Sequence, residues 1–122
     1  MCLNVNGMLG EKLEANNGLR ESVKMYDFVS ISETWTNECS TVDIEGFKCF
    51  CKHRVRRKNA KRDSGGLVVY VNESIERGVY EEEWDGFEDV LILRLDHEHF
   101  GWDEDIFVLC VYMRCRVYKC RC

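Results

Sequence analysis

The hydrophobic positions of this chain fall into short runs separated by polar turns, a pattern typical of a strand-rich protein. Residues 17–25 follow helical spacing instead, with Leu19, Val23 and Tyr26 on one face and Asn17 as a favoured first residue. Runs of β-branched and aromatic residues predict strands at residues 2–5, 27–32, 46–51, 67–71, 89–95 and 106–113. The pattern therefore predicts an α/β chain with one helix and about six strands.

Most of these runs are apolar without a break, which is typical of strands that are covered on both faces. One short helix covers only part of one sheet face, so we expect further covering layers to come from sequence beyond Met113. The acidic stretch between the last two runs, which contains Gly101, is expected to be a hairpin connection or a short loop. Residues 1–113 are expected to form a partial domain. Residues 114–122 (RCRVYKCRC) show no turn signal and no period, and are expected to be an off-pattern tail.

The 122 residues carry a net charge of −5, but the charges are segregated along the chain. Residues 52–62 hold seven Lys or Arg and no acid, whereas residues 81–105 hold eleven acids and a single Arg. A basic loop on an otherwise acidic chain predicts a contact with phosphate at one defined place, not a general polyanion-binding surface. The candidate nucleic-acid contacts are the loop residues Arg54, Arg56, Arg57, Lys58, Lys61 and Arg62.

Eight cysteines would suggest a disulfide framework in a secreted chain, but residues 1–10 have neither a basic segment nor a long apolar stretch. No apolar run approaches the roughly 20 residues of a membrane-spanning helix. We therefore expect reduced thiols, a nuclear or cytoplasmic location without secretion, and no membrane partner. A small zinc module is a further alternative, with ligands from Cys49, Cys51 and His53 and from Cys115, Cys120 and Cys122, although structural zinc usually takes wider ligand spacing.

Oxygen-bearing side chains follow the ends of three predicted strands. Asn4 and Asn6 end the first strand, Glu33 follows the second, and Tyr112 lies near the end of the last. Each has an ordinary role too, as a turn residue, a solvated carboxylate or a core tyrosine. In a functional role, a carboxylate on a strand end is a rigid ligand for Mg²⁺, and a tyrosine hydroxyl donates to a phosphate oxygen.

The order of these motifs resembles one protein family. The chain has Asn-Val-Asn-Gly at residues 4–7, then a helix, Ser-Glu-Thr-Trp at 32–35, a basic loop, Ser-Gly-Gly at 64–66, and Val-Tyr at 111–112. Over residues 1–113 it resembles the endonuclease/exonuclease/phosphatase family, and is most similar to the endonuclease domains of non-LTR (LINE-type) retrotransposons. The resemblance implies the N-terminal half of a four-layer α/β sandwich, with a mixed, largely antiparallel sheet and one or two helices.

The resemblance also implies roles for the strand-end residues. Asn4, Glu33 and Tyr112 match catalytic positions, and Glu33 and Asn6 match the site of a divalent metal, Mg²⁺. The implied reaction is hydrolysis of a DNA phosphodiester, in which the metal polarises the phosphate and an activated water attacks in line.

Two family motifs are missing from the sequence. There is no Gly-Asp pair to begin a Gly-Asp-x-Asn motif, and the one Asp-His pair, Asp96-His97, lies in the wrong order for the Ser-Asp-His motif and is left unassigned. We therefore expect a truncated domain that is inactive alone, binds DNA weakly, and self-associates through an exposed sheet edge. The alternative is a non-catalytic nucleic-acid or protein-binding remnant that uses basic loop 52–62.

Overall fold

The computed structural model describes residues 1–5, 13, 17–34, 43–53, 58–59, 65–84, 86 and 89–112. Their strands are β1 (Cys2–Asn4), β2 (Phe28–Ser32), β3 (Phe47–Lys52), β4 (Leu67–Asn72), β5 (Val79–Glu82), β6 (Val90–Leu95) and β7 (Ile106–Val111). Their helices are α2 (Asn17–Lys24), α3 (His97–Phe100) and the 3-10 turn η1 (Glu76–Gly78). The chain is thus a mixed α/β protein, as the sequence pattern predicts.

The strands form two sheets. The first has the order β1-β2-β4-β3, in which β1 and β2 are parallel and the other pairings are antiparallel. The second is an antiparallel sheet in the order β5-β6-β7. Strand β4 (LVVYVN) is central in the first sheet because its β-branched run is buried on both faces, from Leu67 to Val71.

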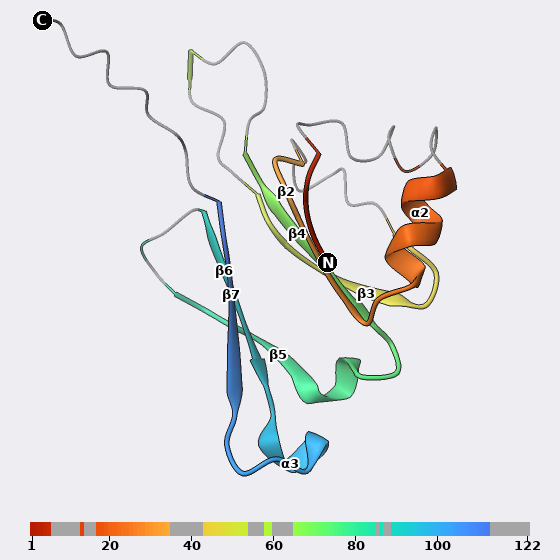
Figure 1. Ribbon diagram of the computed structural model, residues 1–122. Coiled ribbons are helices and arrows are strands. Elements are labelled where there is room, and N and C mark those ends of the chain that lie inside the picture. The colour runs from red at the N-terminus through yellow and green to blue at the C-terminus, as the bar shows by residue number, and fades with distance from the viewer. Residues whose placement is uncertain are drawn as a thin grey trace, which may run out of the picture.

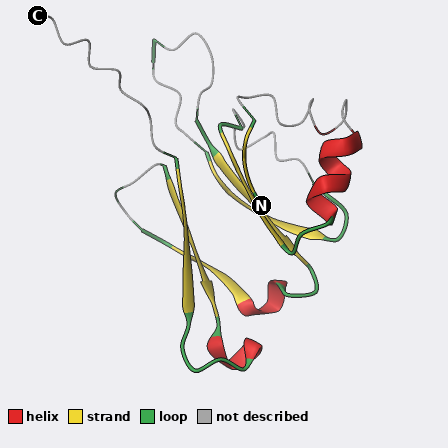
Figure 2. Ribbon diagram, viewed as in Figure 1, coloured by secondary structure: helices red, strands yellow, loops and turns green. Residues whose placement is uncertain are grey.

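Alternate residues of β4 face two different apolar layers. Val68 and Tyr70 pack on the side of α2, in a cluster with Val23 of that helix. Val69 and Val71 pack on the other side, against the inner face of the second sheet. Figures 1 and 2 show the resulting order of layers, with the four-stranded sheet between α2 and the three-stranded sheet.

The predicted elements agree with the structure within one or two residues, with two omissions. Strand β5 and turn η1 were not predicted, because residues 76–82 are half charged and show no apolar run. Strands β6 and β7 pair antiparallel, so the expected hairpin connection between them is confirmed, and this connection contains helix α3. It is capped by Asp96, whose carboxylate accepts from the His99 backbone, and it ends at Gly101 with a φ of 71°.

Two expectations about burial were wrong. Tyr26 does not belong to the buried face of α2, since the helix ends at Lys24 and the tyrosine is 46% exposed. Strand β7 is covered on one face only, because Cys110 is buried whereas the neighbouring Leu109 is 53% exposed. In the described residues no helix is both long and apolar enough to cross a membrane.

Candidate functional site

The candidate residues Asn4 and Glu33 lie at the ends of two adjacent parallel strands, β1 and β2. Asn4 lies opposite Ser32 in the β1–β2 register, and the Val5 backbone N–H donates to the Ser32 carbonyl at 3.1 Å. Glu33 is the next residue after Ser32. Parallel strands present their carboxyl ends at the same edge of a sheet, so the backbones of the two predicted site residues lie at one edge.

The basic loop connects β3 to β4, and both strand ends that flank it lie at the same edge of the sheet. Ser32 pairs with Leu67 at the start of β4, and Leu67 pairs with Lys52 at the end of β3. The strand spacing of about 4.8 Å puts Asn4 and Lys52 about 14 Å apart across the sheet. In Figure 1, β1 (dark red), β2 and β7 all run toward the upper end of the view.

Glu33 has an unusual backbone. Its φ is 55°, the one positive φ among the described non-glycine residues. A left-handed conformation costs an L-residue roughly 1–2 kcal/mol and persists only where its surroundings hold it. Here Glu33 stands between Ser32, hydrogen bonded to β1, and Thr34, which is 1% exposed. Strain of this kind clusters at functional sites, which makes this carboxylate the leading candidate at the strand end.

Tyr112 lies at the end of β7 in the second sheet. Its backbone N–H donates to the Asp89 carbonyl at 2.9 Å, and its half-buried ring packs against the inter-sheet core. Val111, just before it, pairs with Val90 at the start of β6. Val90 and Lys52 line one cavity, so the Tyr112 end of the second sheet is the same end that carries Asn4 and Glu33.

Most of the predicted DNA contacts and one metal ligand fall outside the described residues: Asn6, Arg54, Arg56, Arg57, Lys61 and Arg62. Lys58 is described, in a turn with Asn59, and it is exposed. An exposed lysine in the β3–β4 connection is suitably placed for a phosphate contact.

A cavity of about 320 Å³ opens between the ends of β3, β5 and β6. It brings Lys52 together with Glu81, Glu82, Glu83 and Trp84. None of the described residues that line it is a predicted catalytic residue. The cavity therefore combines one lysine at the start of the basic loop with three glutamates of the second sheet's β5 segment.

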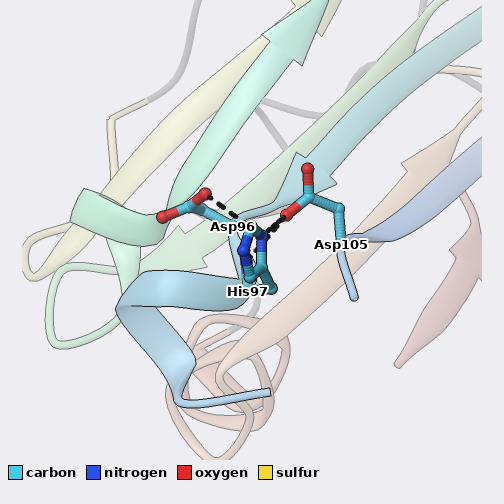
Figure 3. Close-up of side chains that lie close together, drawn as sticks. All are labelled: Asp96, His97 and Asp105. Carbon is cyan, nitrogen blue, oxygen red and sulfur yellow. Dashed lines mark hydrogen bonds and ion pairs between the residues drawn. The ribbon is translucent and has the colours of Figure 1, made fainter. Parts of the chain in front are cut away.

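A second cluster of polar groups lies at the opposite end of the second sheet (Figure 3). Asp105 Oδ1 accepts from the His97 backbone N–H at 2.8 Å and lies 2.6 Å from His97 Nδ1. Asp96 caps α3, and its carboxylate is 4.0 Å from the same imidazole. Hydrogen bonding to Asp105 raises the pKa of His97, and hydrogen bonds from the His97 backbone and ring lower the pKa of Asp105.

Three potential metal ligands meet in this cluster, since atoms of Asp96, His97 and Asp105 lie within 4.8 Å of one another. However, Arg94 Nη1 is 3.3 Å from both carboxylates, and Arg94 Nε donates to Glu82 at 2.8 Å. The guanidinium already supplies the positive charge that a metal would bring. We interpret the cluster as a clamp between the start of α3 and the start of β7. Asp96 and His97 are adjacent in the sequence, but only the fold brings Asp105 into contact with them.

The zinc alternative is described in part, because Cys115, Cys120 and Cys122 lie outside the described residues. Cys49 and Cys51 share one face of β3, and Cys51 Sγ is 3.3 Å from His53 Nε2. Burial raises the pKa of Cys49 to about 12 and also raises the pKa of Cys51. Both thiols are therefore expected to be protonated at neutral pH in the metal-free protein. In the described part of the chain, three ligand atoms gather only at Asp96, His97 and Asp105.

The oxygen ligands at the strand ends can be compared with those that Mg²⁺ usually takes in proteins. Glu33 supplies one carboxylate, and Asn6, the second predicted metal ligand, lies outside the described residues. Mg²⁺ is often held by one or two carboxylates together with substrate phosphate and water, so the single carboxylate of Glu33 meets the smallest such requirement. Comparison with known proteins adds no assignment, because no family model and no curated protein matches the chain.

Proposed function

We propose that this chain is a truncated retrotransposon-type endonuclease domain, descended from a Mg²⁺-dependent DNA phosphodiester hydrolase and inactive alone. The observation that carries the proposal is the pairing of Asn4 with Ser32, which puts the strained Glu33 beside Asn4 at the ends of two parallel strands. Tyr112 ends a strand of the second sheet at the same end of the protein.

Each residue has a specific part in this proposal. Glu33, with Asn6, holds Mg²⁺, which polarises a phosphate oxygen when bound. The Asn4 amide orients the phosphate or the carboxylate, and the Tyr112 hydroxyl donates to a phosphate oxygen as charge develops there. The sequence has no Gly-Asp-x-Asn motif and no Ser-Asp-His motif, so it lacks a general base and a phosphate-binding imidazole. Binding without turnover is the expected behaviour.

The four-layer sandwich is part of the proposal. Two sheets face each other across a shared core, and α2 covers one outer face. On the outer face of the second sheet Phe107, Leu109 and Val111 are each at least half exposed. Such an apolar face supports a fold whose last layer is not supplied by the described residues.

Nicking of supercoiled plasmid in Mg²⁺ tests whether the domain is inactive. The purified chain should leave the plasmid intact at protein concentrations that bind it. Nicking that disappears in Glu33→Gln but persists in the clamp variant Asp105→Asn would contradict inactivity and would assign a complete site to this chain. Nicking by the wild type that survives Glu33→Gln would contradict the assignment of the metal ligand to Glu33.

The alternative function is non-catalytic binding of nucleic acid, or of an acidic protein, through basic loop 52–62. It is favoured by the exposure of Lys58 in this connection. Binding through phosphates weakens with salt, with a slope near −0.9 per phosphate neutralised on duplex DNA. Lys58→Ala should reduce that slope by about one. Binding that is insensitive to salt would exclude this function. A nuclear or cytoplasmic location would suit either role.

A further inference from the structure

Two cysteines lie on outer strands of the two facing sheets. Among the described strands, Cys2 belongs to β1, at one end of the order β1-β2-β4-β3, and Cys110 belongs to β7, at one end of the order β5-β6-β7. Cys2 is exposed, whereas Cys110 is buried. The backbone beside Cys2 is held in the ladder, since the Ser30 N–H donates to the Met1 carbonyl at 2.8 Å. One accessible thiol and one buried thiol therefore lie at the rims of the two sheets.

The register of the first sheet shows which way Cys2 faces. Cys2 lies opposite Ser30, and Ser30 lies opposite Val69. Val69 in turn lies opposite Phe50. Residues directly opposite each other on neighbouring strands share a face of the sheet. Val69 and Phe50 pack in the same apolar cluster as Cys110. Cys2 therefore ends a row of side chains on the face that packs against the second sheet.

Ser30 connects the two cysteines. Its side chain is hydrogen bonded to the Cys110 thiol, so Cys110 already reaches the first sheet at this residue. Only one strand spacing, about 4.8 Å, separates Ser30 from Cys2. Burial raises the pKa of Cys110, the Ser30 hydrogen bond lowers it, and the charge of an ionised Cys2 raises it again. The last effect is the one expected of two thiols that lie near each other.

We propose that Cys2 and Cys110 form a reversible disulfide when the protein meets hydrogen peroxide, and that this bond links the two sheets. The Cys2 thiolate attacks the peroxide, the O–O bond breaks, and a sulfenic acid forms as hydroxide leaves with the thiol proton as water. The Cys110 sulfur then attacks the Cys2 sulfur. An S–S bond forms, the S–O bond breaks, and the second hydroxide leaves with the Cys110 proton as water. The two thiols lose two electrons, and one peroxide becomes two waters. A dithiol reductant reverses the reaction by exchange.

The other described cysteines face a different layer. Cys49 and Cys51 pack in the cluster on the α2 side of the first sheet, so that sheet lies between them and Cys110. Cys110 is thus the described thiol that is positioned to react with a Cys2 sulfenic acid. Two sheets packed face to face accept an inter-sheet disulfide. Here the bond would join β1 to β7, which are the first and last described strands, and would close a long loop.

The test uses the full chain, first reduced and then treated with a stoichiometric amount of hydrogen peroxide. Tryptic peptides 1–12 and 95–114 each contain one cysteine, so a cross-link between them identifies the bond without ambiguity. Mapping without reductant should find this cross-link, about 2 Da lighter than the sum of the two thiol peptides, and dithiothreitol should remove it. Oxidation should also raise the Tm by about 10 °C, because a disulfide that closes a loop of roughly 100 residues restricts the unfolded chain.

Two variants complete the test, each compared with its own reduced form. Cys2→Ser should lose both the cross-link and the rise in Tm, and the exposure of this position lets the variant fold. Cys49→Ser is the matched control, since Cys49 faces α2, and it should keep both. Recovery of the two peptides unlinked, a cross-link from Cys110 to another cysteine instead, or a rise in Tm that persists in Cys2→Ser would overturn the proposal. These readouts do not depend on whether the strand-end site binds metal or DNA.

Discussion

Asn4 lies directly opposite Ser32 in the parallel ladder of β1 and β2, and the chain then turns at Glu33 with a φ of 55°. The two predicted site residues are 29 positions apart in the sequence, and the ladder brings them to one edge. The carboxylate belongs to the first residue after β2, and sites close to strands are held more precisely than sites within long loops. The proposals about the function of this chain depend on that relationship.

The backbone at Glu33 gives the first prediction. At an ordinary extended position glycine is less stable than alanine by roughly 0.5–1 kcal/mol, because glycine loses more entropy on folding. At a left-handed φ the glycine variant becomes the more stable of the two, since only glycine adopts this conformation without strain. Glu33→Gly should therefore be more stable than Glu33→Ala by about 1 kcal/mol in denaturant unfolding. Greater stability of the alanine variant would show that the left-handed conformation is not held in solution.

The two faces of β6 give a second prediction. Leu93 is fully buried against the first sheet, whereas the adjacent Ile92 is half-buried on the other face. Truncating a buried leucine typically costs about 2–5 kcal/mol. Leu93→Ala should therefore lower the free energy of unfolding by this amount, and Ile92→Ala by less than half as much. Equal losses at the two positions would contradict the packing of the second sheet on the first.

The clamp between His97 and Asp105 predicts a pH dependence of stability. The pKa of His97 is raised above 6.5 in the folded protein. Its contribution to the free energy of unfolding is therefore present below pH 6.5 and is lost as the pH rises through the folded pKa. The pKa of Asp105 is lowered below 3.8, so its contribution is present above that pH and is lost as the pH falls through the folded pKa. The clamp should stabilise the hairpin most between these two values.

Asp105→Asn isolates this effect, because it removes the charge and keeps the size of the side chain. The difference in Tm between wild type and variant should be largest between pH 4 and 6.5, and should decline on both sides. A difference that does not change with pH would contradict the ionic part of the clamp.

The cysteines give a prediction about reactivity. Burial raises the pKa of Cys49 to about 12 and raises the pKa of Cys110, so both thiols should resist alkylation at neutral pH in the folded protein. Cys2 is exposed and should react before both of them. Mass spectrometry of peptides after brief labelling measures the order. Early modification of Cys49 would show that the first sheet opens locally.

The fold was predictable where the apolar period was strong. LVVYV at β4 and VLILRL at β6 have no other reading than buried strands, and the helical spacing of Leu19 and Val23 located α2. Strand β5 was not predictable, because VYEE is stabilised by its pairing with β6 and not by its own apolar content. Helix α3 depends on a cap at Asp96 and on packing against Gly78, neither of which has an apolar period.

The candidate site was predictable in part for a related reason. Strand-end positions follow from local sequence, so the sequence predicts that Asn4, Glu33 and Tyr112 lie at strand ends, whereas their roles rest on the family resemblance alone. The left-handed φ at Glu33 could not be anticipated, because glutamate has no preference for it and the surrounding structure imposes it. The cavity that joins Lys52 to Glu81, Glu82 and Glu83 required two sheets to meet, which no local pattern encodes.

The most direct test of the central claim is a titration with Mn²⁺, which replaces Mg²⁺ at oxygen ligands and broadens nearby amide resonances in NMR spectra. We predict broadening centred on residues 4–5 and 31–34, lost in Glu33→Gln and retained in Asp105→Asn. Broadening centred on Asp96 and Asp105 instead, unchanged by Glu33→Gln, would contradict the assignment of the metal half-site to the ends of β1 and β2.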